Sequence, residues 1–250
     1  MLIDQKSSDA QPPPYTSVGN QQAPSQPNDP VASSSLTAAF VVATPPADAR
    51  RCNMFTASVA HEKIKGAYIV DMSLQIPEAF LAPLAANETV RPNLKLHSEF
   101  GRVDAEVWVR NPIEPVTNGD KKQQGPTLTF GSSMGSVHVK LHTLGTQPCQ
   151  VSVQSSYGSA TVTLPHDFVG LLSLQRQYGQ IKPLPPRVQV LSDVGGDMKC
   201  FVGDLGLIGR DGWDGHTVKA QSPYSKVTVA FIDDVTQASA ASPWSWLGLG

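Results

Sequence analysis

A proline-rich motif near the N-terminus is the clearest candidate for a binding function. Pro12, Pro13, Pro14 and Tyr15 fit the Pro-Pro-x-Tyr pattern that WW domains read. Consecutive prolines favour the polyproline II helix, so little entropy is lost on docking, and the tyrosine fills a second groove. Proline-rich tails also produce such strings by chance, which is the alternative. The motif predicts a WW-domain protein as a partner.

Two short motifs resemble metal sites but are better explained without a metal. His138 and His142 follow the strand pattern of Val137, Val139 and Leu141. On a strand their four-residue spacing separates them by about 13 Å, too far to share one zinc ion, so we expect outward-facing histidines. The Asp-Gly pairs of 211–215 are ordinary turn chemistry, and Trp213 is expected to cover the end of the core. We expect no metal and no cofactor.

Acidic residues do not form a catalytic pattern in the sequence. Glycoside hydrolysis needs two carboxylates across a cleft, and Glu99, Asp104 and Glu106 all belong to one sequence segment. Asp233 and Asp234 follow the last expected strand and are predicted to be solvated. No nucleophile elbow, phosphate loop or dinucleotide fingerprint is present in the sequence. We therefore expect that the protein is not an enzyme.

Composition excludes several classes of protein. The chain has 250 residues, a net charge of −2, 40% hydrophobic and 16% charged residues. This balance argues against nucleic-acid binding, which needs a basic surplus. No stretch approaches the roughly 18 apolar residues of a membrane span, and the first residues lack the apolar core of a secretory signal. Three widely spaced cysteines suggest no disulfide framework. A cytoplasmic location is expected.

The elements that would carry any site are strands arranged in repeats. Apolar residues alternate with polar ones from residue 54 onward, and Pro83 limits any helix in 78–86 to one turn. A unit of two alternating segments around a Ser-x-aromatic-Gly centre recurs. Its glycine position, which Ser225 occupies in the last copy, falls at 101, 135, 158, 179, 203 and 225, so successive intervals are 34, 23, 21, 24 and 22 residues. The long interval contains a loop-like insertion at 111–126.

This repeat predicts an all-β fold, for which two arrangements remain open. One is a β-solenoid-like stack of two-strand coils, and the other is a β-sandwich of repeated hairpins. The coil is favoured because Phe, Met and Tyr are poor residues for a two-residue hairpin loop. We expect these aromatics to stack at an inward-facing corner above a column of serines, and the glycine to supply a positive φ. Arg176 is the exception in the serine column.

The chain is expected to contain one domain and two tails. Residues 1–48 are rich in Pro, Ser and Gln and are predicted to be a disordered tail. Residues 49–235 form the all-β repeat domain, and 236–250 form a C-terminal tail. The apolar stretch 243–249 is expected to cap the stack or to dock a partner. The 87–89 acceptor would be glycosylated only in a secreted protein.

Several motifs in fixed order resemble a known family. They are Ile64-Lys65-Gly66-Ala67-Tyr68, Arg91-Pro92-Asn93-Leu94, Tyr157-Gly158-Ser159 and Cys200-Phe201-Val202-Gly203-Asp204. Over about residues 50–235 the chain resembles a fungal, mainly basidiomycete, family catalogued as a domain of unknown function. The repeat unit is also similar to that of bacterial adhesin-like domains, which implies a β-solenoid-like fold. Neither resemblance supplies a catalytic residue.

Three functions are compatible with these observations. The first is a non-enzymatic interaction or scaffold protein whose tail recruits a WW-type partner. The second is an adhesin-like surface-binding module, and the third is a carbohydrate-active enzyme. The absence of a catalytic pattern in the sequence favours the first.

Overall fold

Among the residues that the structure describes, the regular secondary structure consists almost entirely of strands. The computed structural model describes residues 44–84, 90–110, 125–145, 147–209 and 212–232. These residues contain fifteen strands and two single 3₁₀ turns, η1 (Glu78–Phe80) and η2 (Leu205–Leu207). The all-β prediction is confirmed, as is the single turn expected before Pro83. Within the described parts of the chain, no helix has the length and apolar character that crossing a membrane requires.

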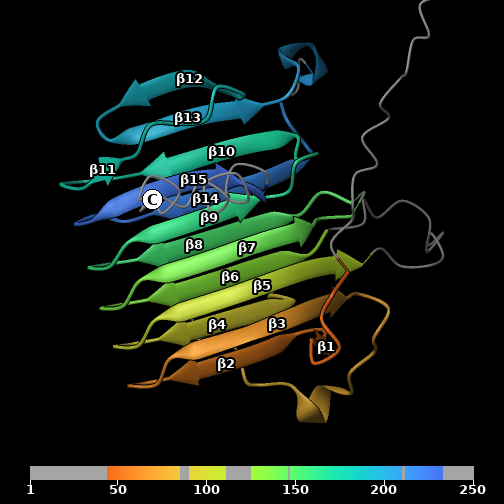
Figure 1. The fold of residues 1–250 in the computed structure, drawn as a ribbon. Helices are drawn as coiled ribbons and strands as arrows, with labels where there is room; N and C mark the ends of the chain where they lie inside the picture. The colour runs from red at the N-terminus through yellow and green to blue at the C-terminus, as the bar shows by residue number, and fades with distance from the viewer. Residues whose placement is uncertain (1–43, 85–89, 111–124, 146, 210–211, 233–250) are drawn as a thin grey trace, which may run out of the picture. The chain divides into compact units, whose positions relative to one another are not determined.

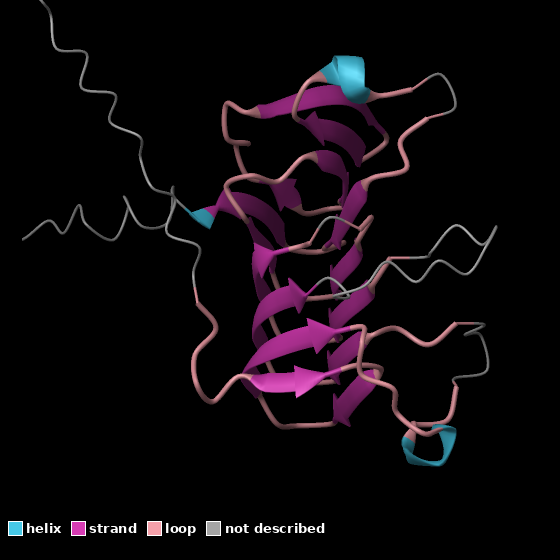
Figure 2. Cartoon of the chain, turned by 90° about the vertical axis from the view of Figure 1, so that its right-hand side faces the viewer, coloured by secondary structure: helices cyan, strands magenta, loops and turns pink. Residues whose placement is uncertain are grey.

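The strands form two sheets that face each other (Figures 1 and 2). Sheet A has seven strands, in spatial order β1 (Arg50–Cys52), β3 (Ile64–Asp71), β5 (Val103–Arg110), β7 (Val137–Thr143), β9 (Ala160–Leu164), β15 (Lys226–Phe231) and β11 (Gln180–Ile181). Sheet B has eight, in spatial order β12 (Val188–Val194), β13 (Asp197–Val202), β10 (Gly170–Gln175), β14 (His216–Gln221), β8 (Gln150–Ser155), β6 (Thr127–Ser132), β4 (Leu94–Ser98) and β2 (Phe55–Val59).

Each repeat contributes one strand to each sheet, and we call such a pair of strands a coil. Within a coil the two strands do not pair with each other. Instead, every strand pairs in parallel with the equivalent strand of the next coil, as in Leu94 beside Leu128 and Val103 beside Val137. Repeated hairpins would give antiparallel neighbours, whereas stacked coils give this parallel register.

The coils do not stack in chain order. The last two strands in sequence, β14 and β15, lie between the coil of β8 and β9 and the coil of β10 and β11. The coil of β10 and β11 therefore comes earlier in the sequence than the coil of β14 and β15, although β14 and β15 lie next to β8 and β9 in the stack (Figure 1). The periodicity of the sequence does not reveal this insertion.

An antiparallel hairpin ends sheet B. Strand β13 pairs antiparallel with both β10 and β12, and Gly195 and Gly196 form the β12–β13 turn at φ values of 60° and 87°. The weak repeat copy at 198–207 is therefore not a coil, which corrects the sequence interpretation. Its Gly203 has a φ of 121° and leads to η2 rather than to a strand.

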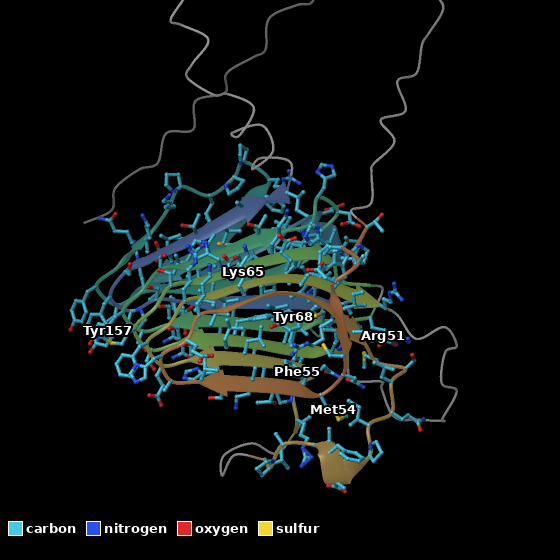
Figure 3. The ribbon with its side chains drawn as sticks, turned by 60° about the horizontal axis from the view of Figure 1, so that its bottom comes forward. Arg51, Met54, Phe55, Lys65, Tyr68 and Tyr157 are labelled. Carbon is cyan, nitrogen blue, oxygen red and sulfur yellow. The ribbon has the colours of Figure 1, made fainter. Side chains whose placement is uncertain are left out.

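Alternating side chains from both sheets fill the space between them. Val70, Leu96, Phe130 and Leu172 are completely buried there. Near the end of the stack where β1 and β2 are the edge strands, the rings of Phe55 on β2 and Tyr68 on β3 lie 6.1 Å apart (Figure 3). The Arg50 guanidinium lies 5.1 Å from the centre of the Phe55 ring, so a cation–π contact covers part of this exposed end.

A ladder of hydrogen bonds joins the coils at the repeated corner. Gly135 donates its N–H to the hydroxyl of Ser132 at 2.8 Å, and this hydroxyl donates to the carbonyl of Gly101 in the previous coil at 2.9 Å. Hydroxyl–carbonyl bonds of this kind recur at every buried serine of the column, namely Ser98, Ser132, Ser155 and Ser222. The predicted serine column is confirmed, and its role is to satisfy buried backbone groups.

The structure corrects two expectations about this corner. The glycines at 101, 135, 158 and 179 do not have a positive φ. Glycine is needed because a Cβ at Gly135 would lie 2.1 Å from the carbonyl oxygen of Gly101. The residues before these glycines, and Tyr224 before Ser225, also point outward, not inward: each of Phe100, Met134, Tyr157, Tyr178 and Tyr224 is at least 50% exposed. The chain turns at the serine, so strict alternation ends there.

Asparagines join the coils at the opposite corner. Asn93 donates to Asn53 at 2.8 Å, and its own side-chain oxygen accepts the N–H of Thr127 at 2.8 Å. Asn53 in turn donates to the carbonyl of Leu74. The Arg91-Pro92-Asn93-Leu94 motif therefore has a structural role in coil stacking.

Candidate binding surface

The outer face of sheet B carries a continuous row of polar side chains. The strand registers place one residue from each of seven neighbouring strands in this row, which we call the lysine row. Its members, in spatial order, are Thr56, Lys95, Thr129, Ser152, Lys219, Ser173 and Lys199. At about 4.8 Å per strand the row is about 29 Å long. Lysines and hydroxyls thus follow one straight path across the strands.

The strands that form most of this face carry lysines but no carboxylates. Strands β2, β4, β6, β8, β14 and β10 contain no Asp or Glu, whereas Lys95 and Lys219 project from two of them. Among the strands of sheet B, only β12 and β13 contain acidic residues. On β13, Asp197 lies 3.6 Å from Lys199. Lys199 also donates to Ser173 at 2.8 Å. These six strands therefore carry two lysines and no carboxylate of their own.

Two shallow depressions lie along the lysine row. One, of about 220 Å³, is lined by residues that include Ser152, Leu171 and Lys219. The other, of about 160 Å³, is lined by residues that include Lys95, Thr129 and Ser152. Gly131 helps to open the second, because a Cβ there would come within 2.8 Å of Nδ1 of His97. Sequence reasoning missed this surface, although the polar positions of each repeat were visible as a signal.

The outer face of sheet A is different because it carries carboxylates, and these pair with neighbouring side chains. Asp104 lies 3.7 Å from Lys63 and 3.6 Å from Arg102. Glu106 lies 2.9 Å from Nε2 of His142. These carboxylates are held by neighbouring cations or by histidine and are not set across a cleft from each other.

His142 is outward-facing but not solvated. Its side chain is only 5% exposed, and its ring stacks on Trp108 with centroids 4.0 Å apart. Burial lowers the pKa of His142, although the hydrogen bond with Glu106 acts in the opposite direction. Burial also lowers the pKa of His138. Among the described residues, no group of three or more His, Cys, Asp or Glu is placed to hold a metal ion.

The exposed aromatics form a column along the corner. Tyr157 stacks on Tyr224 at 5.1 Å and Tyr224 on Tyr178 at 5.6 Å, and Phe100 stacks on His61 at 4.8 Å. Tyr157 projects away from the sheets in Figure 3. Stacked rings cover one another's faces, which sugar stacking would need to be free. This column therefore supports coil stacking rather than a sugar site.

The remaining sequence candidates have structural explanations. Trp213 packs edge-on against the ring of Phe201 at 5.0 Å. Phe201 is buried but alternates with the core residues Cys200 and Val202, so Trp213 covers a side chain on the outer side of sheet B and not the end of the core. Arg176 lies on the last coil, partly exposed, where it pairs with Asp193 at 3.4 Å. The three cysteines are buried, and burial raises the pKa of Cys52 to about 11, of Cys149 to about 12 and of Cys200 to about 11. They are poor nucleophiles at neutral pH.

Several predictions concern residues outside those that the structure describes. They are the WW-ligand motif Pro12, Pro13, Pro14 and Tyr15, the tail 1–43, the acceptor 87–89, Asp211, the acidic pair 233–234 and the apolar stretch 243–249. These predictions stay predictions.

One family model matches the chain. Its description is a domain of unknown function, DUF7330, and the match covers residues 53–234. No curated protein and no solved structure matches the chain. The family match confirms the resemblance to a family of unknown function, and it spans strands β2 to β15.

Proposed function

For this chain, which belongs to the DUF7330 family of unknown function, we propose a role as a non-enzymatic interaction protein that binds through the outer face of sheet B. The observation that carries the proposal is the lysine row, a straight line of lysines and hydroxyls across seven strands. Six of these strands lack any carboxylate.

The architecture makes this face a suitable binding platform. Side chains in register on a parallel stack keep fixed spacings, because each coil is hydrogen-bonded to its neighbours along both strands. The buried serine and asparagine ladders hold the two corners. A pre-organised polar surface loses little entropy when it binds a ligand.

A non-catalytic role is supported by the state of the candidate reactive groups. Asp104 and Glu106 are engaged by neighbouring side chains, and the cysteine thiols have raised pKa values. A catalytic acid or nucleophile would need a free group with a suitable pKa beside an open cleft.

The N-terminal tail adds a second binding function to the proposal. Pro12, Pro13, Pro14 and Tyr15 would recruit a WW-domain protein, so that the chain links this partner to whatever occupies sheet B. A WW-domain array tests this directly. The full chain should be retained and the Tyr15→Ala variant lost; equal retention of both would dismiss the WW role.

The platform itself is tested by reversing charge on each sheet. A Lys95→Glu/Lys219→Glu double variant is compared with Lys65→Glu, which reverses an exposed lysine on the outer face of sheet A (Figure 3). Bound components of a cell extract should be retained by the wild type and by Lys65→Glu and lost by the double variant. Equal retention by all three would refute sheet B as the binding face.

An adhesin-like surface-binding module is the second candidate. It is favoured by the hydroxyl and amide side chains that surround the lysines, since such groups suit a hydroxyl-rich surface. Surface labelling of intact cells distinguishes it from a purely cytoplasmic interaction protein.

A further inference from the structure

The inserted coil changes how the chain closes one corner of the stack. At this corner the chain leaves β7 of sheet A and continues into β8, which belongs to the next coil of sheet B. The segment 165–169 leaves β9 in the same way but continues into β10, which lies one strand further because β14 is inserted between β8 and β10 (Figure 1). Strand β14 is preceded by η2 and begins at His216, beside Gly170. The inserted coil is therefore reached from sheet B and not from a strand of sheet A.

A cavity of about 390 Å³ lies at this corner. It is lined by residues at the ends of β5 and β7, by the segment after β9 and by the first residue of β14. Its apolar walls consist of side chains that are themselves buried, namely Val109, Leu144, Pro165 and Phe168. Small-molecule sites combine apolar walls with a few polar groups and measure about 300–1,000 Å³. The cavity therefore suits the apolar body of a small ligand.

The imidazole of His216 supplies one hydrogen-bond donor to this cavity. Its Nδ1 accepts the backbone N–H of Cys149 at 3.1 Å. Burial lowers the pKa of His216, although Asp167 acts in the opposite direction, so the ring is neutral at pH 7. A neutral imidazole whose Nδ1 accepts carries its proton on Nε2. The Nε2–H is therefore the group that can donate to a ligand.

Asp167 supplies an acceptor to the same cavity. Its side chain is exposed and has no ion-pair partner in the described part of the chain. Asp167 would repel an anion, and an ammonium group has no lone pair that could accept from the Nε2–H of His216. A hydroxyl group both accepts and donates, so it suits the imidazole and the carboxylate together.

We propose that this cavity binds a small neutral molecule with an apolar body and one hydroxyl group, such as a phenol. The apolar body lies against Leu144 and Phe168, and the hydroxyl accepts from Nε2 of His216 and donates to Asp167. This site is separate from the lysine row, so the inference does not rest on the proposed function of sheet B.

The test uses the full chain and three matched probes, which are 4-propylphenol, its methyl ether and 4-propylbenzoate. The ether has lost the hydroxyl donor, and the benzoate carries an anion in place of the hydroxyl. Affinity is measured at pH 7 by NMR titration of isotope-labelled protein, which also locates the site. The variant Asp167→Lys reverses the charge at the cavity. Glu62→Lys is the matched control, because it makes the same change at an exposed residue of the opposite corner, next to Gly101.

The wild type should bind 4-propylphenol about fivefold more tightly than its methyl ether, which is the ratio that one net hydrogen bond gives. It should also prefer the phenol to the benzoate by about fivefold, because Asp167 repels the anion. Asp167→Lys should bind the benzoate more tightly than the phenol, whereas Glu62→Lys should keep the wild-type order. The signals that shift should include those of Leu144, Phe168 and His216.

Three results would overturn the inference: no binding of 4-propylphenol, equal affinity for the three probes, or an unchanged order of probes in Asp167→Lys. Shifts confined to the depression around Leu171 would overturn it as well, because the phenol would then occupy the outer face of sheet B. If Asp167→Lys does not fold, the order of the probes and the mapped signals of the wild type still test the proposal.

Discussion

Replacing Gly135 by alanine tests whether the repeated glycines are set by close approach of neighbouring coils. A Cβ at this position would lie 2.1 Å from the carbonyl oxygen of Gly101 and 2.5 Å from its carbonyl carbon. Both are backbone atoms held in the adjacent coil, so the contact cannot be relieved by a side-chain rotation. The corner of one coil must move away from the other.

The cost follows from the hydrogen bonds that cross this corner. Ser132 donates to Gly101, and the N–H groups of Ser133 and Met134 donate to the previous coil at 3.2 and 2.8 Å. Three such bonds at about 1 kcal/mol each give a loss of about 3 kcal/mol. For a domain of this size, that corresponds to a Tm about 6–12 °C lower.

A second glycine on the same coil provides the control. A Cβ at Gly131 would meet Nδ1 of His97 at 2.8 Å, and this is a side chain that can rotate. Gly131→Ala should therefore change the stability by less than about 1 kcal/mol, helped by the reduced entropy of the unfolded chain. Thermal and urea unfolding of both variants measure these two changes in stability. A Gly135→Ala protein as stable as the wild type would refute the close-approach explanation.

Three further predictions concern buried groups. Ser132→Ala leaves the N–H of Gly135 unsatisfied and should cost about 1–3 kcal/mol in urea unfolding, whereas Ser58→Ala, at an exposed position, should cost almost nothing. Because burial lowers the pKa of His142, the unfolded chain takes up the proton first, so stability should fall as the pH drops through 6.5; His142→Gln should make this dependence shallower, and an unchanged slope would contradict it. The three thiols should be inert to a thiol reagent in the native protein and react fully in denaturant; fast native labelling would show that they are accessible.

Much of the fold could be predicted from the sequence because local patterns dictate it. Alternation as in Leu94 and Leu96 indicates one buried face of each strand, and the recurrence of Ser98, Ser132 and Ser155 indicates a column. The direction of Phe100 could not be predicted, since its place in the alternation suggested the core. The hydroxyl of Ser98 accepts the N–H of Gly101 and turns the chain before that pattern can continue.

The binding surface was harder to predict because it depends on register between coils. Lys95 and Lys219 are far apart in sequence, and only the insertion of β14 next to β8 places them in one row. The repeats around Tyr178 and Tyr224 are similar enough that either could follow the repeat around Tyr157. Their order in space depends on contacts that a repeat pattern does not contain.

The inserted coil also dictates when the domain becomes complete during synthesis. Strands β10 to β13 leave the ribosome before β14 and β15. In the finished domain, however, β10, β12 and β13 pair with the rest of sheet B only through β14, and β11 pairs with sheet A only through β15. A nascent chain that has reached residue 209 thus has two unfinished edges with a one-strand gap between them. Strands β14 and β15 fill this gap. Translation must therefore reach these strands before cooperative folding of the domain can finish.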